Sequence, residues 1–165
     1  GILPLAVFHH ADPVRAKQEA LRHLGWTHPG PKMAGAATLI IDLLLAVLGG
    51  TPLEAAMTAA AERQDNPLMG RPFRRWLGDA DEDVIGPRLS TACYVEHAIP
   101  AVLYLALKYH DAPEKALIVN TNLGGDNAAR GAVLGALLGA ENGLDGFPRR
   151  WIDGLKNPPP ALFPE

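Results

Sequence analysis

The residue types best suited to chemistry lie in the stretch TNLGGDNAARGAVLGALLGAENG, at residues 121–143. Within it, Asp126 follows Gly124 and Gly125 and stands directly before a helical pattern, which is the N-cap position. The carboxylate of Asp126 can accept hydrogen bonds from the free amides of the first helical turn. It can equally belong to a metal or phosphate site, because glycines let a ligand approach the backbone closely. The residues alone leave both roles open.

The helix start behind Asp126 favours an anion such as phosphate through its free amides and its dipole. Asp126 would repel that anion unless a hard cation such as Mg²⁺ lay between them, and one carboxylate is too few to hold the cation. Asn127 and Arg130 add polar groups in the first turn. Arg130 can bind an anion with its guanidinium fork, or it can form a salt bridge with Asp126 at i,i+4 spacing.

The helix expected after Asp126, up to about residue 141, carries small residues at four-residue spacing. They are Ala128, Ala132, Ala136 and Ala140 on one ridge and Gly131, Gly135 and Gly139 on the next. Each glycine inside a helix costs about 1 kcal/mol relative to alanine. That cost predicts the close approach of another helix or backbone, so we expect this helix near the centre of the fold.

The elements that must position this stretch are predicted to be helices. They cover residues 13–24, 34–48, 51–63, 91–109, 113–119 and 148–155, with a kink or a displaced start expected at Pro100. No stretch alternates convincingly like a strand. Residues 63–90 are rich in Pro and Gly, and the acidic residues at 79–83 are interpreted as a solvated loop rather than a calcium site. The sequence therefore predicts an all-α fold forming one domain over residues 1–165.

The composition narrows the classes of partner. A net charge of −3 over 165 residues gives no electrostatic reason to expect nucleic-acid binding. The longest apolar run, AGAATLIIDLLLAVLGG, contains Asp42 and is short for a bilayer, so we interpret it as a core helix and expect no membrane partner. The lone Cys93 lies in a helical pattern and is expected to be a buried, reduced thiol of a cytoplasmic protein. The apolar start, GILPLAVF, indicates that an earlier part of the fold is missing or lies on another polypeptide.

Four stretches together resemble the ADP-ribosylglycohydrolase superfamily, the group that includes the dinitrogenase-reductase-activating glycohydrolases and the J1 crystallins. They are GILPLAVF, WTHPGPKMAGAATLIIDLLLAVLGG, ACYVEHAIPAVLYLAL and EKALIVNTNLGGDNAARGAVLGALLGAENGLDGFPRRWIDGL. The stretches occur in the family's order and cover most of the chain, and residues 63–90 match least. The last stretch is the most specific, with its Gly-Gly-Asp turn, its small-residue helix and its FPRRW segment.

The resemblance implies an all-α orthogonal multi-helix bundle that hydrolyses an ADP-ribose bond with two Mg²⁺ ions. In active members an early Asp-Asp-Thr type motif and a late Gly-Gly-Asp-x-Asp-Thr motif hold these ions. The chain resembles the C-terminal part of such a protein and contains no early motif. In the late motif Asp126 matches the first Asp, whereas Ala128 and Ala129 stand where the second Asp and the Thr would be. Two oxygen ligands are thus missing, which puts the Mg²⁺ site in doubt.

The resemblance also places two residues beside the substrate. His28 matches a His in the family's TH loop on the substrate side, and Tyr94 matches an aromatic that lines the cleft. From the residues alone, His28 is a loop side chain able to form hydrogen bonds, and Tyr94 is a core aromatic. Glu96 and His97 are adjacent, so they point to different faces and do not form an acid–base pair.

The first hypothesis for function is a hydrolase that cleaves an ADP-ribosyl or related glycosidic bond with metal-activated water. Asp126 is its expected catalytic and metal-binding residue, and the expected substrate-binding residues are His28, Tyr94, Gly124, Gly125, Asn127 and Arg130. The expected partners are an ADP-ribosylated or otherwise glycosylated small molecule or protein, and an N-terminal segment of the same fold. The alternative is a non-catalytic ligand-binding or structural, crystallin-like member with a degraded metal site, and the replacements at 128 and 129 favour it. A third possibility is a variant site that acts on another nucleoside or glycoside.

Overall fold

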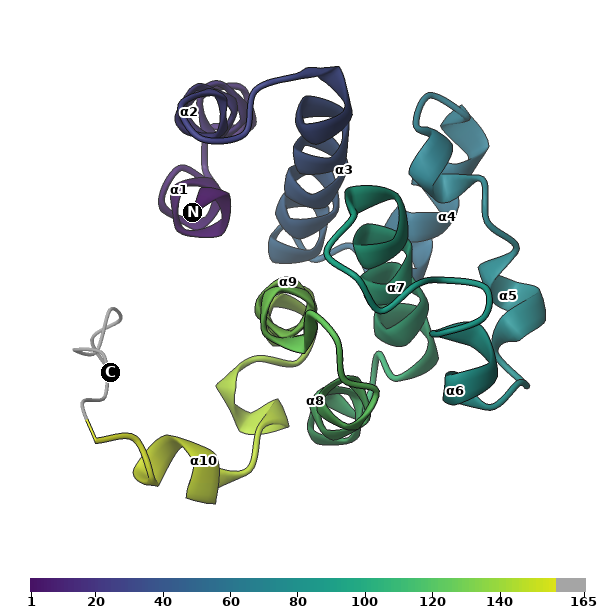
Figure 1. Ribbon diagram of the computed structural model, residues 1–165. Coiled ribbons are helices and arrows are strands. Elements are labelled where there is room, and N and C mark those ends of the chain that lie inside the picture. Colours follow the sequence, from purple (N-terminus) through teal and green to yellow (C-terminus); the bar gives the residue numbers. More distant parts are fainter. Residues whose placement is uncertain (157–165) are drawn as a thin grey trace.

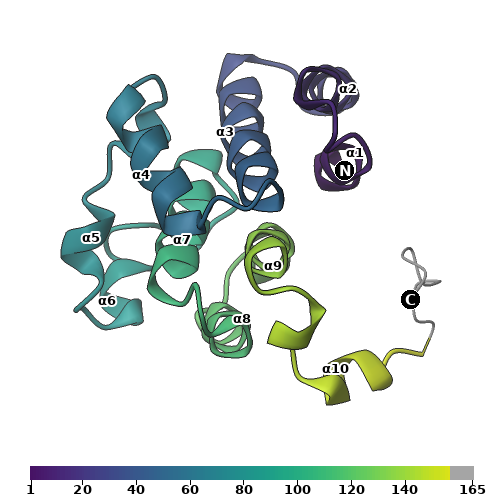
Figure 2. The same cartoon turned by 180° about the vertical axis from the view of Figure 1, so that it is seen from behind.

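Three long helices meet at the centre of the protein: α3 (Pro31–Leu48), α7 (Val95–Lys108) and α9 (Asn127–Asn142). The computed structural model describes residues 1–156 and is shown from two opposite sides in Figures 1 and 2. Helix α3 contacts both α7 and α9, and α7 contacts α9. Every named element in the described residues is helical, which confirms the predicted all-α fold.

Shorter elements surround these three helices (Figure 1). They are α1 (Ile2–Phe8), α2 (Pro13–Gly25), α4 (Leu53–Arg63), α5 (Phe73–Trp76), α6 (Asp81–Val84), α8 (Pro113–Asn122) and α10 (Arg149–Asp153), with short 3₁₀ turns η1 (Pro67–Met69) and η2 (Leu144–Gly146). Helices α1 and α2 pack on one side of α3, and α4 packs against α3 and α7. Helix α9 lies between α3 and α8 in both views.

Most helix boundaries follow the Pro and Gly signals in the sequence. Helix α2 begins at Pro13 after its N-cap Asp12, whose side chain accepts a hydrogen bond from the Arg15 amide. Helix α3 begins at Pro31, three residues earlier than predicted, because proline suits the first turn of a helix. Residues Ile2–Phe8 form a helix that was not predicted.

Helix α7 is the most deeply buried element. Every residue from Pro100 to Leu107 is buried, and Pro100 lies inside the helix. The helix begins at Val95 rather than at residue 91, so the residues before it form a loop. As a result Cys93 is exposed, and its predicted burial in a helix was wrong.

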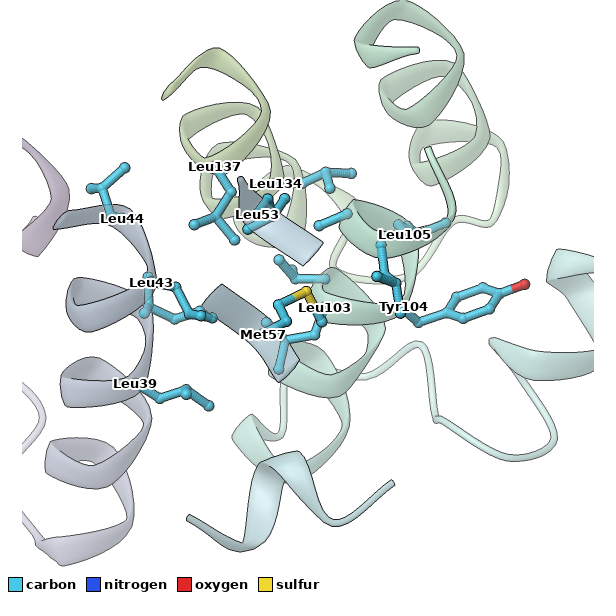
Figure 3. Packing of buried hydrophobic residues seen from close by; sticks show 14 of the residues in the cluster. Leu39, Leu43, Leu44, Leu53, Met57, Leu103, Tyr104, Leu105, Leu134 and Leu137 are labelled. Atoms are coloured by element: carbon cyan, nitrogen blue, oxygen red, sulfur yellow. The ribbon is translucent and has the colours of Figure 1, made fainter. Parts of the chain in front are cut away.

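Leucine is the most frequent residue of the core, and Figure 3 shows core leucines on α3, α4, α7 and α9. Leu39 and Leu43 of α3 face Leu103 of α7, and Leu134 and Leu137 of α9 complete the cluster. Burying each such side chain stabilises the fold by about 1.5–3 kcal/mol. This core holds the three long helices together.

Helix α3 is long and apolar enough, by length and composition, to cross a membrane. A core helix meets the same criteria, and the contacts of α3 with α2, α4, α7 and α9 are those of a core helix. Asp42, the one acidic residue of α3, forms an ion pair with Lys17 of α2 at 2.7 Å. The charge in this apolar segment therefore has a partner on the neighbouring helix.

The small-residue helix α9 packs near the centre of the fold, as expected, but only part of its surface is buried. Its glycine ridge does face another helix: a Cβ at Gly131 would lie 3.1 Å from Asn120 Nδ2, and one at Gly135 would lie 3.9 Å from a Leu117 methyl group. On the alanine ridge, in contrast, Ala128 and Ala132 are exposed. The close approach of a helix, α8, is confirmed, while the fully buried position at the centre belongs to α7.

Candidate functional site

The Gly-Gly-Asp turn is held against the loop that precedes α7. Gly124 and Gly125 both adopt the left-handed conformation, with φ of +68° and +62°. A Cβ at Gly125 would lie 2.2 Å from the Thr91 carbonyl oxygen, so this position requires glycine. The amide of Asp126 donates a hydrogen bond to the same oxygen at 2.9 Å. The turn and the loop therefore form one unit, although they lie far apart in the sequence.

The side chain of Arg130 lies beneath this turn and is only 1% exposed. Its Nη2 donates to the Gly124 carbonyl at 2.7 Å, and its Nη1 donates to the Thr91 carbonyl at 3.1 Å. Its Nε donates to Asn120 Oδ1 at 3.1 Å. The guanidinium thus joins the turn, the loop before α7 and the end of α8.

These contacts correct the expected role of Arg130. The sequence left it either reaching a bound anion or pairing with Asp126, and the structure shows neither arrangement. No ion pair between the two side chains occurs among the described residues, and the donors of Arg130 point at protein oxygens. Burial lowers the pKa of Arg130, and the charge of Asp126 opposes that shift.

Two asparagines complete the turn. Asn120, which is 2% exposed, donates from Nδ2 to the Asn127 carbonyl at 2.8 Å. Asn127 donates from Nδ2 to the Thr121 carbonyl at 3.0 Å. The side chain of Asn127, expected to bind substrate, is therefore engaged in holding the turn.

The carboxylate of Asp126 remains without a hydrogen bond in the described part of the chain. Asp126 occupies the N-cap position of α9 as predicted, yet its side chain caps no amide of the first turn. The residue is half-buried. An acid held on a rigid turn with no protein donor can still accept a hydrogen bond from a ligand or a water molecule.

The other two predicted site residues lie on exposed loops. His28 stands between α2 and α3, where its Nδ1 is 2.9 Å from Thr27 Oγ1. Tyr94 is the N-cap residue of α7 and is 66% exposed, so the interpretation as a core aromatic was wrong. Within residues 1–156, the only side-chain hydrogen bond of His28 is to Thr27, and neither His28 nor Tyr94 forms a hydrogen bond or ion pair with Asp126.

An ion pair ties the starts of α3 and α7 together. Lys32 Nζ lies 2.5 Å from Glu96 Oε1, and this hydrogen bond lowers the pKa of Glu96 below its usual value. His97 instead accepts a hydrogen bond from the Ser90 amide at 3.2 Å. Glu96 and His97 therefore serve different partners, as predicted. Because Thr91 also contacts the turn, the starts of α3, α7 and α9 are linked by a chain of contacts.

Cavity volume does not single out one place as the site. A pocket of about 450 Å³ lies between the starts of α3 and α7, where Lys32, Asn66 and Glu96 line it. A pocket of about 460 Å³ lies beside the turn, lined by Asn127, Thr121 and Trp151. Another of about 460 Å³ lies between α4 and α5, away from the turn. The chemistry of the residues, rather than the size of a hollow, makes the turn the candidate site.

The donor set at the turn does not fit a magnesium site. Mg²⁺ requires an octahedral set of oxygen ligands, of which a protein site supplies at least one or two carboxylates along with substrate and water. Ala128 and Ala129 supply no side-chain oxygen, and no group of three or more His, Cys, Asp or Glu residues within 1–156 is placed to hold a metal ion. Asp126 is the only carboxylate on the turn, and the cation beneath the turn is Arg130.

Sequence reasoning missed two residues of this unit, Thr91 and Asn120. Both act through contacts with distant parts of the chain, and Thr91 acts through its backbone carbonyl, which no residue type would reveal. For Asn120 the available signal was a polar side chain directly after the apolar end of the helix predicted at residues 113–119.

Comparison with known families now adds to this geometry. The family model described as ADP-ribosylglycohydrolase matches residues 2–163. A comparison with curated proteins finds no match. The family match covers the all-α bundle and the Gly-Gly-Asp turn alike, so the chain belongs to the ADP-ribosylglycohydrolase family.

Proposed function

We propose that this chain is a glycohydrolase-type domain that recognises an ADP-ribosyl or related glycosyl group at the turn before α9, with Asp126 as its essential acid. The observation that carries the proposal is the state of the Asp126 carboxylate. It sits at a helix start on a turn fixed by glycines and by Arg130, and no protein group in the described residues uses it. Family membership supplies the class of substrate.

Hydrolysis of a glycosidic bond needs more than this acid. Water must attack the anomeric carbon, a base must take its proton, and an acid must protonate the leaving group, so glycosidases generally use two carboxyl groups. Asp126 can fill one of these roles. Residues 121–130 contain no acidic residue besides Asp126. We therefore propose that a further carboxyl group comes from an N-terminal segment of the same fold, acting as a partner of residues 1–156.

A second candidate function is ligand binding without catalysis. The observation that favours it is the sequence after Asp126, where Ala128 and Ala129 provide no side-chain oxygen and Arg130 is buried in the structure of the turn. Such a member would hold the glycosyl group and leave its bond intact.

The two candidates are separated by assaying hydrolysis and binding on the same protein. Hydrolysis of ADP-ribosylated arginine and of O-acetyl-ADP-ribose is measured with Mg²⁺ and with EDTA, and ADP-ribose binding is measured by calorimetry. Asp126→Asn is compared with Asp83→Asn, which changes an exposed carboxylate on α6. Hydrolysis that is lost in Asp126→Asn but retained in Asp83→Asn supports the hydrolase. Binding without hydrolysis supports the ligand-binding member if the binding is weakened in Asp126→Asn and unchanged in Asp83→Asn. Absence of both activities contradicts both.

A further inference from the structure

Arg130 is the largest fully buried side chain in the described part of the protein. A buried charge is costly unless hydrogen bonds and an opposite charge compensate it. The hydrogen-bond partners of Arg130 are neutral oxygens: two backbone carbonyls and one amide side chain. The charge that favours its ionised form is that of Asp126. The protein therefore contains a buried guanidinium next to the candidate site.

The oxygens around Arg130 are of the kind that a hard cation binds. Backbone carbonyls and carboxylates are typical ligands of divalent cations in loops. Here the carbonyls of Gly124 and Thr91 instead accept hydrogen bonds from the guanidinium group of Arg130. Arginine stays protonated at all accessible pH values, and its planar fork fixes several acceptors at once.

We propose that Arg130 is a permanent internal cation of the Gly-Gly-Asp turn, which orders the turn and positions Asp126 without a divalent metal ion. Through the Gly124 carbonyl it holds the two left-handed residues that precede Asp126. Through the Thr91 carbonyl it holds the loop that leads to Tyr94 and α7. Arg130 is thus a positioning residue, and this role does not depend on whether the site is hydrolytic.

The first test measures thermal unfolding of the whole chain with MgCl₂, with MnCl₂ and with EDTA. Because Arg130 already satisfies the carbonyls of the turn, the melting temperature should be the same in all three solutions. A melting temperature that rises with either metal, or falls with EDTA, would overturn the proposal.

The second test follows amide hydrogen exchange in residues 120–127 of Arg130→Lys and Arg130→Met. Arg130→Lys keeps the charge but loses the planar fork, so exchange in this segment should become faster by about tenfold. Arg130→Met should show a larger increase and a melting temperature lower by about 5 °C or more. Arg15→Met, at an exposed position on α2, is the matched control and should behave like the wild type. Wild-type exchange in Arg130→Met would contradict the proposal.

A third comparison separates the role of a cation from simple packing. Ala128→Asp places a second carboxylate near Asp126, and it is made both with Arg130 and with Arg130→Met. If Arg130 takes the place of a cation, Mg²⁺ should raise the melting temperature only in the double variant. An equal response of both proteins would show that the guanidinium only fills space. If Arg130→Met does not fold, Arg130→Gln takes its place in both comparisons, because glutamine removes the charge but can still donate hydrogen bonds to the carbonyls.

Discussion

Two aspartates in this protein occupy opposite situations. Asp126 stands on the turn before α9, and its carboxylate accepts no hydrogen bond in the described residues. Asp81 begins α6 and accepts three: from Tyr104 at 2.8 Å and Lys108 at 2.9 Å on Oδ1, and from Tyr109 at 2.6 Å on Oδ2. Figure 3 shows the ring of Tyr104 pointing away from the leucine core, and its hydroxyl is the group that donates to Asp81.

This difference shows that one aspartate stabilises the fold while the other is left available for chemistry. The sequence interpretation assigned residues 79–83 to a solvated loop, yet the Asp81 side chain is only 13% exposed and ties α6 to the end of α7. At the turn before α9, in contrast, two backbone carbonyls and Asn120 accept the hydrogen bonds of Arg130, so Asp126 is left available. An aspartate is thus structural or available depending on which donors the fold brings to it.

Asp81 and Asp126 would have the same structural role if each contributed equally to the free energy of unfolding. Asp81→Ala leaves two tyrosine hydroxyls without their acceptor and removes the ion-pair partner of Lys108, so we expect a loss of about 3 kcal/mol in the free energy of unfolding. Chemical denaturation measures it. Asp83→Ala, on the exposed side of α6, is the matched control and should change stability by less than about 0.5 kcal/mol. An equal loss in both variants would show that the Asp81 network contributes little.

The packing of the turn against Thr91 can be tested by comparing substitutions of its two glycines. Gly125→Ala forces a Cβ into the Thr91 carbonyl as well as a left-handed alanine, so we expect a loss of about 2–3 kcal/mol. Gly124→Ala meets no atom within 4 Å and carries only the conformational penalty of about 1–2 kcal/mol. Thermal unfolding of both variants checks the order. A smaller loss for Gly125→Ala would mean that the turn does not pack against Thr91 in solution.

The pH dependence of stability should report Asp81. Burial raises the pKa of Asp81, but hydrogen bonds from Tyr109, Lys108 and Tyr104 outweigh burial and hold the pKa below the ordinary value of 3.8. A lowered pKa means that the carboxylate stabilises the fold above pH 3.8 and that this contribution disappears as the pH falls further. Unfolding followed between neutral and acidic pH should therefore show a steeper loss below pH 3.8 in the wild type than in Asp81→Asn. Identical dependence of stability on pH in the wild type and in Asp81→Asn would contradict this expectation.

The smallest expected effect on stability is that of Asp126→Asn. This change removes no hydrogen bond present in the structure, and it weakens only the charge balance with Arg130. We expect a loss of about 1 kcal/mol or less, measured by denaturation beside Asp81→Asn. A loss as large as that of Asp81→Asn would show that Asp126 is a structural residue, and it would remove the basis for the proposed site.

Much of the fold could be predicted from the sequence. Proline and glycine signals placed α2, α4 and α8 near their observed starts, because local backbone preferences decide where a helix begins. The Gly-Gly-Asp turn and the family were also visible as a local pattern, and the N-cap position of Asp126 was predicted correctly. The close packing signalled by the helix glycines was found as well, against α8.

The partners of the polar side chains could not be predicted in this way. Whether Tyr94 and Cys93 are buried depended on α7 beginning at Val95, which a pattern of apolar residues did not reveal. The burial of Arg130 depended on the Thr91 carbonyl, 39 residues earlier in the chain. Local sequence determined the helices, the turn and the family, because these follow from neighbouring residues. Only the tertiary structure decided which acid is engaged and which is available, because hydrogen bonds and burial are set by groups that meet through long-range packing.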